Sequence, residues 1–246
     1  MYIFQHHKLT VAVKTIRGHR EDNSRPVKTK TLHDQVERWK TLAHKNVLPV
    51  YGTTLEFGPL PSLVCPWVNG GTLTRYLETH PGLSLERRAF RGSHAWATQW
   101  SNVLMDRNGN AYLADFGLLP IVLEFRAVPY LSTTIGSSVR WAAPELFQIP
   151  DAASAPPLQL SMDSDIYSFS SVMLQVLSGN VPYHTFKRDE QVLYAVARTI
   201  KPDRPQASNL TDNYWEFIQV CWSPRRENKR PSATDVSTFL ATQHLS

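Results

Sequence analysis

The sequence has few cysteines and no long apolar run. Only two cysteines, Cys65 and Cys221, occur in 246 residues, and they provide neither a disulfide framework nor metal-ligand spacing. No stretch approaches 18 consecutive apolar residues, so the sequence predicts no membrane span. The first ten residues lack the apolar core of a secretory signal. These absences favour a reducing compartment, the cytoplasm or alternatively the nucleus.

A dense charge of one sign is missing as well. The formal net charge is only +5, and the nearest approach to a basic run, residues 225–230, is interrupted by Glu227. A solvated surface explains such a cluster better than a nucleic-acid site does, so we expect no nucleic-acid partner. Hydrophobic residues make up 42% of the chain, which argues against a disordered protein.

The apolar pattern changes at the pair Gly70-Gly71. Before this pair, short β-branched or alternating runs predict strands, and one stretch has the spacing of a helix with a single buried face. After it, helical spacing dominates, and residues 164–177 are apolar enough to lie at the centre of a domain. The predicted strands are 9–16, 47–53 and 62–66; the predicted loops are 17–30 and 148–160; the predicted helices are 32–42, 72–79, 164–177, 190–198, 213–221 and 233–240; and a hairpin is predicted at 102–114.

Five short segments carry the strongest signal, and their order matters. They are Val11-Ala12-Val13-Lys14, Ala114-Asp115-Phe116-Gly117, Trp141-Ala142-Ala143-Pro144-Glu145, Ser164-Asp165-Ile166-Tyr167-Ser168-Phe169 and Lys229-Arg230-Pro231. In this order they resemble the eukaryotic protein kinase domain, and the phrases around Trp141 and Cys221-Trp222 resemble its tyrosine-kinase and tyrosine-kinase-like branch.

The resemblance covers roughly residues 9–240. It implies an α+β, bilobal, protein-kinase-like fold in a single domain, residues 1–246. The small β-rich N-lobe, residues 1–68, would be truncated. The larger helical C-lobe, residues 69–246, would have an eroded catalytic-loop region.

The same resemblance implies an ATP site that includes Lys14. In kinases this strand-end lysine contacts the phosphates and is held by a glutamate on the following helix. Counting back from His44 places the glutamate's position at Gln35. Glutamine can hydrogen-bond an ammonium group but cannot neutralise it, and Glu37 would face elsewhere on a helix.

The segment that would lie against adenine is residues 63–68. Cys65 would occupy the gatekeeper position, and Pro66, Trp67 and Val68 would offer main-chain groups to the nucleotide. Pro66 removes one N–H donor from this set.

Two oxygen-bearing side chains would bind magnesium. Asn102 and Asp115 are separated by a predicted hairpin, as the catalytic-loop asparagine and the D-F-G aspartate are in kinases. Amide and carboxylate oxygens are suitable ligands for Mg²⁺. ATP and Mg²⁺ are therefore the expected cofactors.

The residues just before Asn102 depart from the family pattern. In kinases an aspartate there orients the substrate hydroxyl and accepts its proton. Its position falls on Ala97, and residues 86–100 contain no aspartate. His94 is better explained as a surface histidine than as a substitute base. No glycine precedes Lys14, so the glycine-rich loop that covers the phosphates is also missing.

The remaining motifs predict the frame of the larger lobe. Glu145 is expected to pair with Arg230, and Asp165 to cap backbone N–H groups at the start of its helix. A phosphate on the Ser/Thr-rich segment 132–138 could be bound by Arg140, although such loops are commonly rich in Ser and Thr without modification.

Three hypotheses follow from the resemblance. One is a catalytically impaired pseudokinase that acts by binding a partner, such as a functional kinase. Another is an active ATP-dependent protein kinase with a protein substrate, Ser/Thr rather than Tyr. A third is that the segment Phe90 to Trp100 is a mistranslated or mis-spliced exon from a gene that encodes an intact kinase, so that the sequence is a truncated or mis-spliced version of that kinase.

Overall fold

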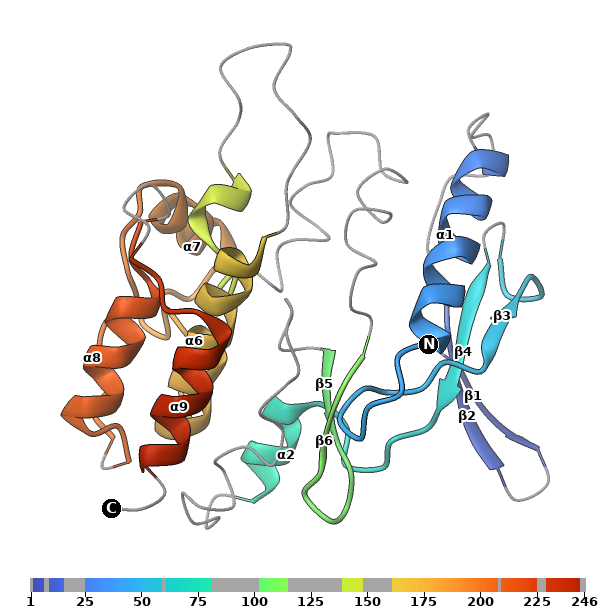
Figure 1. Cartoon of the computed structure of the whole chain (residues 1–246), viewed down its shortest axis with the longest axis horizontal. Coiled ribbons are helices and arrows are strands. Elements are labelled where there is room, and N and C mark those ends of the chain that lie inside the picture. Colours follow the sequence, from blue (N-terminus) through green and yellow to red (C-terminus); the bar gives the residue numbers. More distant parts are fainter. Residues whose placement is uncertain are drawn as a thin grey trace. The chain divides into compact units, whose positions relative to one another are not determined.

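The structure, a computed structural model, describes residues 2–6, 9–15, 25–58, 61–80, 102–114, 139–147, 161–207, 209–224 and 229–243. Two compact units divide the chain: residues 1–71 with 102–130, and residues 72–101 with 131–246. Figure 1 shows the elements of both units. The predicted lobe boundary between residues 68 and 69 stays a prediction.

The first unit contains a four-stranded antiparallel sheet in the order β1-β2-β4-β3. Strand β4 (Ser62–Pro66) has the predicted bounds, and β2 (Leu9–Lys14) ends two residues before its predicted limit. Strand β1 (Tyr2–His6) was not predicted. The predicted strand 47–53 was largely wrong, because β3 (Gly52–Thr54) begins near its end and Val47 makes only an isolated bridge to Leu113.

Helix α1 (Arg25–Lys40) covers one face of this sheet. It begins inside the predicted loop 17–30. Pro26 lies in the first turn, where a helix tolerates proline, so this residue does not prevent the early start. Leu32, Val36 and Trp39 recur at helical spacing and are at most 3% exposed. They pack with Leu63 and Cys65 of β4 in one hydrophobic core.

A two-stranded hairpin completes the first unit. Strands β5 (Val103–Met105) and β6 (Ala111–Leu113) pair around a turn that includes Gly109, whose φ is 81°. The hairpin predicted at 102–114 is confirmed. The Asp106 carboxylate accepts hydrogen bonds from the N–H groups of Asn108 and Asn110, both at 2.8 Å.

The described part of the second unit is mainly helical. Its α-helices lie where the sequence predicted them, within a few residues at each end, whereas the short 3₁₀ helix η3 (Pro144–Phe147) was not predicted. Helix α6 is buried along most of its length. Its neighbours share a core that includes Tyr167, Tyr214 and Trp222. The elements are α2 (Leu73–Thr79), the short 3₁₀ helix η3 (Pro144–Phe147), α6 (Met162–Ser178), α7 (Asp189–Ala197), α8 (Asp212–Cys221) and α9 (Ala233–Gln243).

Within the described ranges, no helix is both long enough and apolar enough to cross a membrane. The predicted loop 148–160 lies outside those ranges.

Candidate functional site

Lys14 lies at the end of β2, on the face of the sheet that α1 covers. The register pairs Ala12 with Cys65 and Lys14 with Leu63, and paired or alternate residues share a face. Leu63 and Cys65 belong to the core beneath α1, so Lys14 is directed to the same side. The sequence placed Lys14 correctly at a strand end beside this core.

The surroundings of Lys14 change its acidity. The residue retains exposed surface, yet protein atoms desolvate its ammonium group and lower its pKa, while Cys65 raises that pKa to a smaller extent. Burial raises the pKa of the Cys65 thiol to about 11, and Lys14 partly opposes this rise. Cys65 is therefore a protonated, largely apolar neighbour of the lysine at neutral pH.

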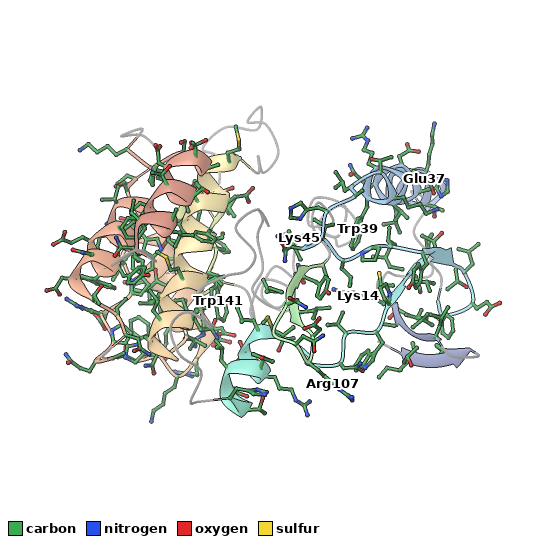
Figure 2. The ribbon with its side chains drawn as sticks, turned by 60° about the horizontal axis from the view of Figure 1, so that its bottom comes forward. Lys14, Glu37, Trp39, Lys45, Arg107 and Trp141 are labelled. Carbon is green, nitrogen blue, oxygen red and sulfur yellow. The ribbon has the colours of Figure 1, made fainter. Side chains whose placement is uncertain are left out.

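Gln35 and Glu37 occupy different sides of α1. Gln35 is half-buried and lies three residues after Leu32 and four before Trp39, so the three share a face. Glu37 is exposed, and its carboxylate lies 2.7 Å from the Lys40 ammonium. The hydrogen bond from Lys40 lowers the pKa of Glu37. Figure 2 shows Glu37 on the outer side of the helix, away from Lys14. The sequence-based expectation that Glu37 faces elsewhere is confirmed.

The segment from Pro66 at the end of β4 to Val68 offers fewer main-chain donors than its length suggests. Pro66 has no N–H group, and the Trp67 N–H donates to the Thr10 carbonyl at 3.0 Å. In the described hydrogen bonds Val68 donates none, although its carbonyl accepts from Gly71 at 3.4 Å. The main-chain donor that this segment can present to a ligand is therefore the Val68 N–H.

Asn102 lies at the open end of the β5–β6 hairpin and is only 6% exposed. Its carbonyl accepts a hydrogen bond from the Ala114 N–H at 2.7 Å. The hairpin thus brings Asn102 next to the residue that immediately precedes Asp115. Asp115 and Ala97 both lie outside the described residues, so the predicted magnesium pair and the eroded catalytic position stay predictions.

The sequence analysis did not single out Asn46, yet this residue joins two parts of the first unit. Its side-chain amide donates to the Ala111 carbonyl at 2.9 Å, and its own carbonyl accepts from the Leu113 N–H at 2.7 Å. The amide side chain of Asn46, directly after His44-Lys45, was the signal that could have identified this contact. Asn46 fixes the hairpin that begins at Asn102 to the loop after α1.

The sequence analysis also did not identify that position 70 requires glycine. A Cβ atom on this residue would lie 2.3 Å from the Met105 carbonyl oxygen, and the neighbouring Gly71 carbonyl accepts from the Met105 N–H at 2.8 Å. Only glycine allows the chain to pass so close to β5. Two consecutive glycines after a predicted strand were the available signal.

In the second unit, the predicted pair of Glu145 and Arg230 is present. The two Arg230 amino groups donate to the two Glu145 carboxylate oxygens at 2.6 and 3.0 Å. Trp222 is a core aromatic residue: it is 2% exposed, and its indole N–H donates to the Ser171 hydroxyl at 3.0 Å.

Asp165 does not have the expected capping role. Ser161 and Ser164 form the capping box of α6, because their hydroxyls reach the first-turn N–H groups directly. The Asp165 Oδ1 atom is instead buried without a hydrogen-bond partner. Burial raises the pKa of this carboxyl group to about 6.

Arg140, the candidate partner for a phosphate on segment 132–138, already makes hydrogen bonds within the protein. Its side chain donates to the Asp189 carboxylate at 2.9 Å and to the carbonyls of Pro182, Tyr183 and Phe186 at 3.0–3.2 Å. These four bonds occupy the guanidinium group, so Arg140 is poorly suited to bind a phosphate. The segment 132–138 lies outside the described residues.

Comparison with known proteins agrees with the kinase resemblance. A family model described as protein tyrosine and serine/threonine kinase matches residues 3–101 and 97–240. The match therefore comes in two parts, and they meet around Ala97, where the sequence departs from the kinase pattern.

Several kinases are similar to the chain at low identity. A probable serine/threonine-protein kinase of Dictyostelium discoideum is 25% identical over 251 residues, which cover 94% of this chain and 17% of that protein. The cytoplasmic tyrosine-protein kinase BMX of Mus musculus is 28% identical over 207 residues, covering 78% and 30%. Mitogen-activated protein kinase kinase kinase 2 of Arabidopsis thaliana is 24% identical over 221 residues, covering 83% and 32%. The chain thus spans no more than a third of each of these relatives.

Proposed function

Because the chain belongs to the protein tyrosine and serine/threonine kinase family, we propose that it is a kinase domain impaired in phosphoryl transfer that acts by binding a partner protein, such as a working kinase. A kinase fold can serve in this way because fold alone does not confer activity. The cytoplasm is the proposed compartment, with the nucleus as an alternative.

The orientation of α1 carries this proposal. The helix presents Gln35 on its sheet-facing side, whereas both of its acids, Asp34 and Glu37, are exposed. A glutamine cannot supply the counter-charge that holds a phosphate-binding lysine in kinases. The alanine at position 97 adds to this defect, because a methyl group cannot orient a substrate hydroxyl or accept its proton.

The remaining donors fit a magnesium nucleotide in part. Lys14 has the charge to bind phosphate oxygens, and the oxygen-bearing side chains of Asn102 and Asp115 suit Mg²⁺. The Val68 N–H would hydrogen-bond the base. Bound Mg·ATP would supply the phosphoryl group for transfer. We therefore propose weak nucleotide binding with little or no turnover.

A thermal-shift titration with Mg·ATP tests nucleotide binding. Wild-type protein is compared with Lys14→Met and Asp115→Asn, and we expect a small stabilisation that both substitutions remove. A radiolabelled phosphate-transfer assay then tests turnover, with incorporation at background as the expected result. Incorporation that Asp115→Asn abolishes would contradict the proposal.

The second candidate is an active protein kinase, Ser/Thr rather than Tyr. It is favoured by the intact Glu145–Arg230 pair and by the loose transition state of phosphoryl transfer, which depends more on positioning and metal electrostatics than on a base. Loss of a general base typically costs about 10²–10⁴-fold in rate. The same radiolabelled assay separates the two candidates.

A further inference from the structure

The outer edge of β6 faces the loop that follows α1. At the open end of the β5–β6 hairpin, the Ala114 N–H donates to the Asn102 carbonyl at 2.7 Å. Because hydrogen-bonded pairs alternate in an antiparallel ladder, Leu113 and Ala111 direct their main-chain groups away from β5. A hairpin of two short strands is only marginally stable by itself. The groups that meet this outer edge therefore determine where the hairpin lies.

Asn46 meets the outer edge of β6 at two points. Its side-chain amide donates to the Ala111 carbonyl at 2.9 Å, and its carbonyl accepts from the Leu113 N–H at 2.7 Å. The residue is only 4% exposed, so water competes little for these bonds. Two contacts that are two residues apart along β6 hold the direction of the strand as well as its position.

The loop that carries Asn46 is itself held by α1. The Trp39 indole N–H donates to the Leu48 carbonyl at 2.8 Å, and the Leu48 N–H donates to the Leu113 carbonyl at 2.8 Å. Trp39, Leu48 and Ala114 also share one hydrophobic core. Asn46 therefore connects the hairpin to a packed part of the first unit.

We propose that Asn46 is a positioning residue for the magnesium pair, Asn102 and Asp115, an inference that rests on the proposed function. Asp115 is the next residue after Ala114, which is bonded to Asn102 across the hairpin. A shift of β6 would therefore displace both metal ligands relative to Lys14, which the four-stranded sheet holds. The Asn46 amide resists such a shift without contacting the metal or the nucleotide.

Magnesium should be sensitive to such a shift. Mg²⁺ requires nearly ideal octahedral geometry, with oxygen atoms at about 2.0–2.1 Å, whereas Ca²⁺ accepts longer and more variable distances. Removing a residue that holds metal ligands in place typically costs about 10–100-fold in metal affinity. The loss of the Asn46 amide should therefore weaken Mg²⁺ binding more than Ca²⁺ binding, and metal-free ATP binding least of all.

A thermal-shift titration of the full chain with metal ions at fixed ATP tests the proposal. In Asn46→Ala, the Mg²⁺ concentration that gives half of the metal-dependent shift should rise about 10–100-fold over wild type. The rise for Ca²⁺ should be smaller, and the shift with ATP in EDTA should equal that of wild type. A structural role alone would lower the melting temperature without ligand and leave the Mg²⁺ requirement unchanged. Asn46→Ser, whose hydroxyl is too short to reach Ala111, repeats the test if the alanine variant folds poorly.

Asn110→Ala is the matched control, because it removes another asparagine amide from the same hairpin. The Asn110 side chain donates to the Asp106 carboxylate at 2.8 Å, near the turn, so its loss should leave the Mg²⁺ requirement at the wild-type value. An equal rise in this variant would overturn the proposal. If Asp115→Asn removes the Mg²⁺ response while Asn46→Ala keeps the wild-type requirement, this inference alone fails. If the Mg²⁺ response survives Asp115→Asn, the proposed magnesium site fails and the inference fails with it.

Discussion

Arg230 binds Glu145 through two parallel hydrogen bonds, 85 residues apart in the sequence. The Arg230 side chain is only 3% exposed, and that of Glu145 is 12% exposed. Arg230 also donates to the carbonyls of Ser223 and Asp163 at 2.8 Å, and its guanidinium lies 5.2 Å from the centre of the Tyr167 ring. One buried side chain therefore joins η3, the start of α6 and the segment after α8.

Removing this arginine should strongly destabilise the second unit. Arg230→Ala leaves the Glu145 carboxylate buried without its counter-charge, which typically costs about 3–5 kcal/mol. Urea unfolding followed by tryptophan fluorescence measures the loss. The control is Lys40→Ala in the exposed pair with Glu37, which should cost less than about 1 kcal/mol. Equal losses in the two variants would show that the Glu145 pair is energetically unimportant.

A methyl group at Gly70 should destabilise the first unit. In Gly70→Ala the new Cβ would lie 2.3 Å from a main-chain oxygen of Met105, and a backbone atom cannot move aside as a flexible side chain can. We expect a loss of a few kcal/mol, measured by thermal unfolding. Gly58→Ala is the control, since a Cβ there meets nothing within 4 Å. The melting temperature of Gly70→Ala should be clearly lower than that of Gly58→Ala. Similar melting temperatures would contradict the close approach of Gly70 to Met105.

Thr199→Gly should stabilise the protein. Thr199 has a φ of 56°, in the left-handed region that a β-branched residue rarely adopts. It is the first residue after Arg198, the C-cap of α7, and glycine is the preferred residue at this next position. The expected gain is about 1 kcal/mol, read from the urea midpoint. Thr199→Ala, which retains a Cβ, should gain less than Thr199→Gly; an equal gain would show that backbone strain is not the cause.

Asp165 should make stability depend on pH. Burial raises the pKa of its carboxyl group in the folded protein to about 6, from an ordinary value of 3.8. Between these values the folded state binds the proton that the unfolded state has released, so this residue's contribution to stability falls as pH rises through the window. Asp165→Asn removes the cost of a buried charge and should stabilise the protein at pH 7 by on the order of 1–2 kcal/mol.

Unfolding in urea at pH 4 and at pH 7 measures this effect. The gain from Asp165→Asn should be much smaller at pH 4, where the carboxyl group is protonated in the folded protein. The contrasting residue is the exposed Asp235, whose pKa is lowered by hydrogen bonds from Ser232. Asp235→Asn should lose stability at pH 7 rather than gain it. A gain from Asp165→Asn that is equal at both pH values would exclude titration as its source.

Gln35→Glu should strengthen nucleotide binding if the proposed function is right. A carboxylate at this position would give Lys14 the counter-charge that kinases use to hold the lysine. The expected result is a larger Mg·ATP thermal shift than in wild type, abolished when Lys14→Met is added. Gln35→Leu is the uncharged control. No difference between the Glu and Leu variants would show that Gln35 does not limit binding.

The sequence predicted regular elements best where one physical signal dominated. Residues 164–177 form an apolar run long enough to require a buried helix, and α6 contains all of them. Strand β1 was missed because Tyr-Ile-Phe shows no alternation, and the exposure of all three residues gives this stretch no buried face that would require one. The strand predicted at 47–53 failed because Asn46 and Leu48 hydrogen-bond to β6, which places this stretch against the hairpin.

Residue roles were harder to predict than elements. Asp165 was expected to cap its helix, but the hydroxyls of Ser161 and Ser164 accept the capping hydrogen bonds instead, at 3.2 and 3.0 Å. Arg140 was one candidate for binding a phosphate, but the carbonyls of Pro182, Tyr183 and Phe186 accept hydrogen bonds from it instead. In each case several residues could satisfy the same donor or acceptor, and only packing determines which one lies within hydrogen-bond distance.

By itself, the sequence determined the family, the order of most elements and the residue types at the candidate site, because motif spacing and apolar periodicity are properties of the chain. The tertiary structure alone decided that the Trp67 N–H is already used by Thr10 and that Gly70 passes against Met105. These facts depend on which distant segments meet, since burial and hydrogen-bond competition arise only when the chain is folded.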